Sequence, residues 1–143
     1  LGKYLGALAL VGLALAPTLW YPAVVGFLGP LDWGATLGAY LGLLFLGSAF
    51  AAVGLWASCM TRNQMVAFIL GFAVCFGLYL FGKVTAFLPA GWLGDVVGYL
   101  GVDRHVENIS KGVLDVQDLV YFGSLTGFFL FFATSILNSR RWR

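Results

Sequence analysis

Charged residues are scarce in this chain: only 10% of its 143 residues are Asp, Glu, Lys or Arg. An ordinary soluble domain has about 25%, so the composition argues against a soluble globular fold. The formal net charge of +2 is too small to indicate nucleic-acid binding, and no stretch interleaves Arg with aromatic residues. We therefore expect no nucleic-acid partner.

Histidine and cysteine are also scarce, with one His and two Cys. A structural zinc site needs about four Cys, His or carboxylate ligands, and these residues supply no complete set. Cys59 and Cys75 fall in different hydrophobic stretches at different depths, so we expect no disulfide. The chain also lacks a glycine-rich phosphate-binding loop and a serine nucleophile elbow. We therefore expect no metal, no cofactor and no ATP hydrolysis by this chain.

Long hydrophobic runs fill most of the sequence, and hydrophobic residues make up 61% of it. A helix needs about 20 predominantly apolar residues to cross the hydrocarbon core of a bilayer. Four stretches approach that length, at residues 4–28, 35–59, 65–87 and 119–137. The sequence therefore predicts an all-α membrane protein with four transmembrane helices, forming a single transmembrane domain over residues 1–143.

Two of these stretches contain residues that disturb a plain span. Pro17 and Pro22 predict a kink in the first stretch, because proline removes a helix hydrogen bond. Lys83 lies near the end of the third, where its ammonium group can reach the interface while its stem stays in lipid. A buried lysine with a function remains the alternative. An ion-coupled carrier usually needs ionisable groups inside the membrane, so the energy for any transport should come from another chain.

The acidic residues all fall on one side of this arrangement. If the four stretches alternate in direction through a bilayer, the six acids collect on one side, together with Lys83, Arg104 and Lys111. Cytoplasmic loops near spans carry an excess of Lys and Arg, so the acid-free side, with both chain ends, should be cytoplasmic. The basic residues on that side are Lys3, Arg62, Arg140, Arg141 and Arg143.

The segment 89–118, between the last two stretches, does not have the character of a span. Its apolar residues recur at helical spacing in two short pieces, which predicts two short amphipathic helices at the outer interface. Asp115 should cap the last span, with Asp118 adding favourable charge in its first turn. The apolar faces comprise Trp92, Val96, Val97 and Leu100 in one piece and Val102, Val106, Ile109 and Val113 in the other.

His105 and Glu107 are the only acid–base candidates in this segment. They are two residues apart in a predicted helix, so their side chains do not face each other. Asp103, Glu107 and Lys111 instead have the four-residue spacing of ordinary ion pairs on a solvated face. We therefore expect no catalytic residue and no enzyme, with a membrane enzyme using His105 and Glu107 as the hypothesis to be tested against this.

Small residues recur at every fourth position in the second stretch, at Gly34, Gly38 and Gly42. Such spacing lets another helix backbone approach closely. We expect these glycines to serve helix packing inside one subunit, with a subunit interface as the alternative.

A set of segments recurs here in a characteristic order and spacing: GKYL (2–5), DWG (32–34), GLWASCMTRNQ (54–64), HVENISKGVLDVQD (105–118), LVYF (119–122) and NSRRWR (138–143). Together they resemble the permease subunits of ABC-2 type ATP-binding-cassette transporters. The resemblance covers the whole chain and is closest to the gliding-motility and nitrous-oxide-reductase-maturation permeases. It implies a six-span bundle, of which this chain would be the C-terminal part, without the first two spans and the coupling helix.

The resemblance also implies partners and a location. A cytosolic ABC ATPase would drive transport, and a second permease subunit would complete the translocation path in a bacterial inner membrane. The turn formed by Thr61, Arg62, Asn63 and Gln64 would lie near the ATPase, although from its residues alone it is a simple hairpin turn. The alternative function is a structural membrane subunit of a secretion or motility complex that moves no solute.

Overall fold

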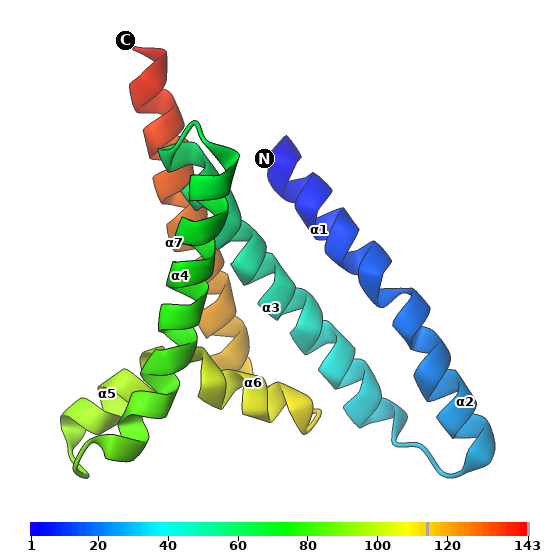
Figure 1. The fold of residues 1–143 in the computed structure, drawn as a ribbon. Helices are drawn as coiled ribbons and strands as arrows, with labels where there is room; N and C mark the ends of the chain where they lie inside the picture. Colours follow the sequence, from blue (N-terminus) through cyan, green and yellow to red (C-terminus); the bar gives the residue numbers. More distant parts are fainter. Residues whose placement is uncertain (114, 143) are drawn as a thin grey trace.

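The computed structural model describes residues 1–113 and 115–142, which form helices without any strand. The α-helices are α1 (Gly2–Leu15), α2 (Trp20–Leu28), α3 (Trp33–Met60), α4 (Gln64–Val84), α5 (Trp92–Leu100), α6 (Val102–Ser110) and α7 (Val116–Arg141), with short 3-10 helices η1 (Pro17–Leu19) and η2 (Thr85–Phe87). The long helices run side by side, and α5 and α6 lie at the end opposite to both chain termini (Figure 1). The predicted all-α fold, with two short helices before the last span, is confirmed.

Four helical segments are long and apolar enough to cross a membrane: Gly2–Leu28, Trp33–Met60, Gln64–Phe87 and Val116–Arg141. Their outward faces carry large apolar side chains, among them Phe27, which is 93% exposed. A soluble protein rarely exposes contiguous apolar surface on this scale, whereas hydrocarbon solvates it without cost. The chain is therefore an integral membrane protein.

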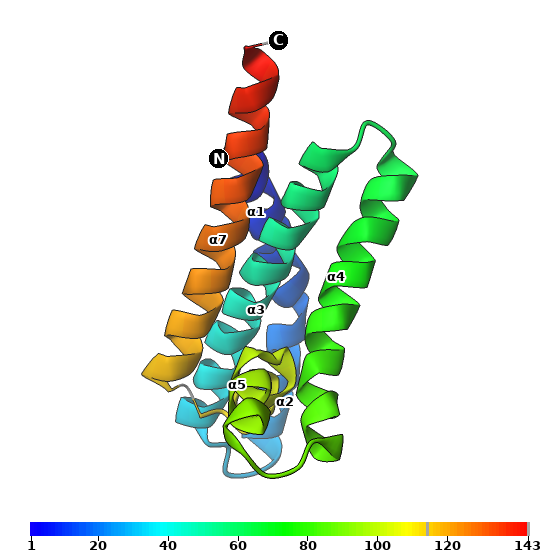
Figure 2. The same ribbon diagram turned by 90° about the vertical axis from the view of Figure 1, so that its left-hand side faces the viewer.

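Helix α3 lies at the centre of the bundle and contacts α1, α4, α6 and α7. The arrangement is clear when the molecule is turned, since α7 and α4 then flank α3 on either side (Figure 2). Small residues on α3 allow these close approaches, and Ala49, Ala52 and Ala57 are completely buried. Packing around Ala49 and Ala52 forms two small apolar clusters, one toward α6 and one toward the middle of α7.

The glycines Gly34, Gly38 and Gly42 do not act as one continuous surface. Gly34 is exposed beside the capping residue of α3, whereas Gly38 and Gly42 are buried. A Cβ atom at Gly42 would lie 2.5 Å from Cγ2 of Ile109, so this glycine is where α6 crosses α3. At this position the close approach is therefore made within the chain, by a short helix rather than by another span.

A hydrogen bond from a neighbouring helix compensates for the interruption of the first span. Pro22 has no N–H to donate to the carbonyl of Thr18, four residues earlier, and the chain forms the 3-10 helix η1 there. The hydroxyl of Tyr40 in α3 donates to the Thr18 carbonyl at 2.7 Å. A neighbouring helix thus supplies the donor that proline removed.

Side-chain caps mark where two of the spans begin. The Asp32 carboxylate accepts from the backbone N–H groups of Gly34 and Ala35 at the start of α3. Asn63 accepts from the N–H of Met65 at the start of α4, at 3.0 Å. Asp115 is the N-cap residue of the last span, as expected, but its side chain makes no cap hydrogen bond.

Candidate functional site

A buried polar cluster joins α5, α6 and α7 at the end of the bundle away from the termini. His105 is 3% exposed and Asp118 is 2% exposed. Nδ1 of His105 is in hydrogen-bond contact with Oδ1 of Asp118, and Nε2 lies 3.1 Å from the carbonyl oxygen of Tyr99. Asn108 donates from Nδ2 to the other carboxylate oxygen of Asp118 at 3.4 Å.

The local sequence explains why His105 faces inward. Val102, His105 and Ile109 are spaced three and four residues apart and form the buried face of α6. Helix α6 ends at Ser110, and Gly112 follows with a φ of 74°, in the left-handed region that glycine adopts readily. The N–H groups of Gly112 and Val113 donate to the carbonyls of Ile109 and Asn108, in the Schellman pattern. This turn sends the chain back so that Asp118 meets His105.

The hydrogen-bond partners constrain the protons of the cluster. A carbonyl oxygen only accepts, so Nε2 of His105 carries the proton that it donates to Tyr99. Nδ1 faces Oδ1 of Asp118, so both ring nitrogens of His105 have a partner inside the cluster.

Aromatic rings close the cluster. The ring of Tyr121 stacks on the imidazole of His105 with centroids 4.0 Å apart and an interplanar angle of 14°. The Tyr121 hydroxyl donates to the carbonyl of Leu100 at 2.6 Å. The last carbonyls of α5, from Tyr99 and Leu100, thus bind side chains of α6 and α7. The polar atoms of His105, Asp118 and Tyr121 are thus used in hydrogen bonds between helices. The cluster is therefore suited to hold the short helices in place.

His105, Glu107 and Lys111, predicted together as an external amphipathic segment, have different environments. His105 is buried against Asp118, whereas Glu107 and Lys111 are exposed and form an ion pair at 2.7 Å. This neighbouring ammonium group lowers the pKa of Glu107 below its ordinary value, chiefly through the hydrogen bond from Lys111. Asp103, expected in the same series, instead binds Nζ of Lys83 at 2.9 Å. Lys83 is exposed, as expected of a lysine at the end of a span.

Asp118 lies in the first turn of the last span, as expected, but its carboxylate is buried, which was not expected. Helix α7 begins at Val116, so the buried carboxylate of Asp118 lies in its first turn. The spacing of His105 between Val102 and Ile109 is that of an inward residue of α6, and this spacing indicates where the partner of Asp118 lies. Among residues 1–113 and 115–142, no group of three His, Cys, Asp or Glu side chains could hold a metal ion.

The opposite end of the bundle carries the turn formed by Thr61, Arg62, Asn63 and Gln64. The turn is short and capped, with Thr61 accepting from the N–H of Asn63. Arg62 is exposed, and Arg140 at the end of α7 donates to the carbonyl of Met60 at 3.3 Å. Both chain termini lie at this end (Figure 1). Arg143, also predicted on this face, lies outside the described residues.

The protein is an all-α integral membrane protein. It has four apolar spans with short helices beside them, and its charged residues differ between the two ends of the bundle. Comparison of the chain with family models, with curated proteins and with solved structures gave no match.

Proposed function

We propose that the chain is a membrane-spanning permease subunit of an ABC-2 type transporter, driven by a separate cytosolic ATPase. The observation that carries this proposal is the difference between the two ends of the bundle. One end has the capped turn around Arg62 and both termini, with basic side chains and no acid among the described residues. The other end is covered by α5 and α6, held by the His105–Asp118 contact.

The basic end supports the orientation and the partner. An excess of Lys and Arg beside spans favours the cytoplasmic side, and on that side an ATPase could reach the turn at Arg62. In this arrangement the ATPase supplies the chemistry. The permease supplies the path and the different packing of its two states, whose balance the ATPase shifts. The membrane is then the inner membrane of a bacterial cell.

Exposed glycines on α7 support the presence of a second permease subunit. A Cβ atom at Gly123 or Gly127 would meet no atom within 4 Å apart from the neighbouring backbone of its own helix. These exposed glycines leave room for another helix backbone to approach closely. A second subunit, or further spans of a longer permease, would use this surface.

Affinity purification from membranes of cells that express the protein, followed by ATPase assays, tests the proposal. We expect a cytosolic ATPase to co-purify and its hydrolysis rate to change when the permease is present. Arg62→Glu should weaken this association, because it reverses a charge at the proposed docking face. Lys111→Glu makes the same change at the opposite end and should have no such effect.

Two results would contradict the proposal. If no ATPase co-purifies and none is stimulated, the chain is not a permease subunit of this class. If loss of the protein prevents assembly of a larger complex while ATP-driven flux continues, the structural-subunit alternative is favoured instead.

A further inference from the structure

A polar hollow of about 450 Å³ lies between the end of α4, η2, α5 and α6. Its wall on the α5 side includes Gly91, Gly94 and Gly98, where backbone borders the space, together with the side chain of Asp95. A Cβ atom at Gly94 would lie 3.5 Å from the carbonyl oxygen of Pro89, an ordinary contact distance. A Cβ atom at Gly98 would lie 3.2 Å from Cγ2 of Thr85, so a side chain there would narrow the space.

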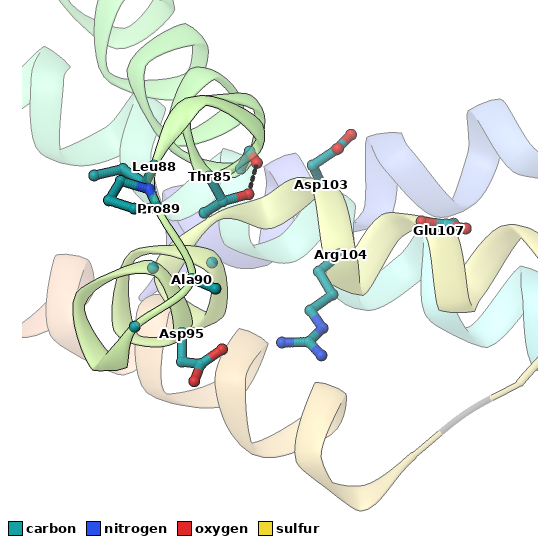
Figure 3. Close-up of a pocket in the computed structure, with 12 residues that line it drawn as sticks. Thr85, Leu88, Pro89, Ala90, Asp95, Asp103, Arg104 and Glu107 are labelled. Carbon is teal, nitrogen blue, oxygen red and sulfur yellow. Dashed lines mark hydrogen bonds between the residues drawn. The ribbon is translucent and has the colours of Figure 1, made fainter.

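Four charged side chains line the hollow, and two of them already have partners. Asp103 binds Lys83 and Glu107 binds Lys111. Arg104 and Asp95 form no ion pair with any described residue. Both extend into the space between α5 and α6, on the same side of the hollow (Figure 3). The hollow therefore offers one cation and one anion to a ligand.

The hollow lies at the level of the membrane interface. Helix α5 presents Gly94 and Asp95 to the hollow, while Trp92, Leu93 and Val96 are exposed, Trp92 to 74%. Amphipathic helices with an aromatic residue on the apolar face lie at the boundary of headgroups and acyl chains. Lys83, at the end of the adjoining span, marks the same level. Lipid headgroups are therefore abundant where the hollow opens.

We infer that the hollow binds a zwitterionic headgroup in which a phosphate ester is linked to a primary ammonium group. The guanidinium group of Arg104 can donate paired hydrogen bonds to the phosphate oxygens. The carboxylate of Asp95 accepts from the ammonium group. A phosphatidylethanolamine lipid supplies both groups, and soluble phosphoethanolamine has the same chemistry. This inference does not depend on the permease proposal.

Other headgroups fit the hollow less well. Recognition of quaternary ammonium groups uses aromatic cages, and no aromatic residue is among the described lining residues, so choline lacks its usual partner. An anionic headgroup without an ammonium group leaves Asp95 unpaired. It also meets the carboxylates of Asp103 and Glu107.

Native mass spectrometry of the purified full chain in detergent tests this selection. The protein is mixed with equal amounts of phosphatidylethanolamine, phosphatidylcholine and phosphatidylglycerol that have identical acyl chains. We expect the ethanolamine lipid to be retained in preference to both others by about tenfold, the factor that one charge-assisted hydrogen bond corresponds to. Equal retention of the three lipids, together with no binding of soluble phosphoethanolamine, would overturn the inference.

Variants locate the binding. Arg104→Ala and the isosteric Asp95→Asn should each abolish the preference, and Gly94→Leu should block binding by filling the hollow. Arg62→Ala removes an exposed cation at the opposite end of the bundle, and should retain the preference. Helical content by circular dichroism shows that each variant is folded. If Arg104→Ala or Asp95→Asn keeps the preference in a folded protein, the assignment is wrong.

A second measurement separates the two sources of the headgroup. Soluble phosphoethanolamine is titrated against the protein in phosphatidylcholine bilayers, with phosphorus NMR as the readout. Competition with the ethanolamine lipid shows that the headgroup alone is recognised. Binding of phosphoethanolamine without lipid selectivity assigns the hollow to a soluble zwitterion. If neither ligand binds, the inference fails.

Discussion

The imidazole of His105 in α6 lies against the carboxylate of Asp118 in α7, and the two side chains are almost completely buried. The contact joins residues 13 positions apart in the sequence. It links a short interfacial helix to the last span, and His105 extends the link to α5 through Tyr99. Loss of either partner would leave a buried polar group without its hydrogen bond.

Asp118→Ala should therefore loosen α6. We expect a loss of about 1–3 kcal/mol in the free energy of unfolding, the cost of leaving a buried polar group unsatisfied. Amide hydrogen exchange in α6 and thermal unfolding in detergent measure the effect. Asp115→Ala is the matched control, because that exposed carboxylate makes no cap hydrogen bond. Equal effects of the two substitutions would argue against a structural role for the buried contact.

Gly42→Ala should destabilise the crossing of α3 and α6. The added Cβ would lie 2.5 Å from Cγ2 of Ile109, so α6 must shift. Overpacking of this kind typically costs about 1–3 kcal/mol. Gly54→Ala in the same helix meets nothing within 4 Å, and should be neutral or stabilising by up to about 1 kcal/mol. Thermal unfolding of both variants distinguishes a packing effect from a change in helix propensity.

The spans could be predicted from the sequence because their length and hydrophobicity are local properties. The position of Asp118 in the first turn of the last span could also be predicted, but the burial of its carboxylate could not. Its carboxylate is accommodated because His105 meets it in the fold. That meeting depends on the turn at Gly112 and on the packing of α6 across Gly42, and neither follows from periodicity.

Tyr40→Phe tests the hydrogen bond that replaces the one lost at Pro22. The variant leaves the carbonyl of Thr18 without the donor now 2.7 Å away, so we expect a loss of about 0.5–1.5 kcal/mol. In a Pro22→Ala background, the new N–H can donate to the same carbonyl, and Tyr40→Phe should cost less. A double-mutant cycle on thermal unfolding measures the coupling. Additive effects would show that the tyrosine hydroxyl does not compensate for the proline.

The Glu107–Lys111 pair predicts a pH effect at the surface. Lys111 lowers the pKa of Glu107 in the folded chain. The favourable contribution of the pair is therefore present above the ordinary pKa of a glutamate and is lost as the pH falls through the lowered value. Lys111→Met should raise the pKa of Glu107, measured by carbon NMR of the carboxyl group. Lys83→Met should change the pKa of Glu107 less, because Lys83 affects that pKa more weakly than Lys111 does.

The orientation of the bundle is testable by cysteine labelling. In a Cys59→Ala, Cys75→Ala background, Gln64→Cys and Ser110→Cys place single thiols at opposite ends without changing a charge. Both positions are exposed. We expect a membrane-impermeant maleimide to label Ser110→Cys in intact cells and Gln64→Cys only after permeabilisation, because basic loops remain cytoplasmic.

The reverse labelling pattern would place the basic turn outside the cell, where no cytosolic ATPase can reach it, and would rule out the proposed docking face. Labelling of both thiols from one side would contradict the arrangement in which the turn at Gln64 and the end of α6 are separated by the membrane. Since α3, α4 and α7 each connect the two ends, that result would require the long helices to lie on the bilayer instead of crossing it.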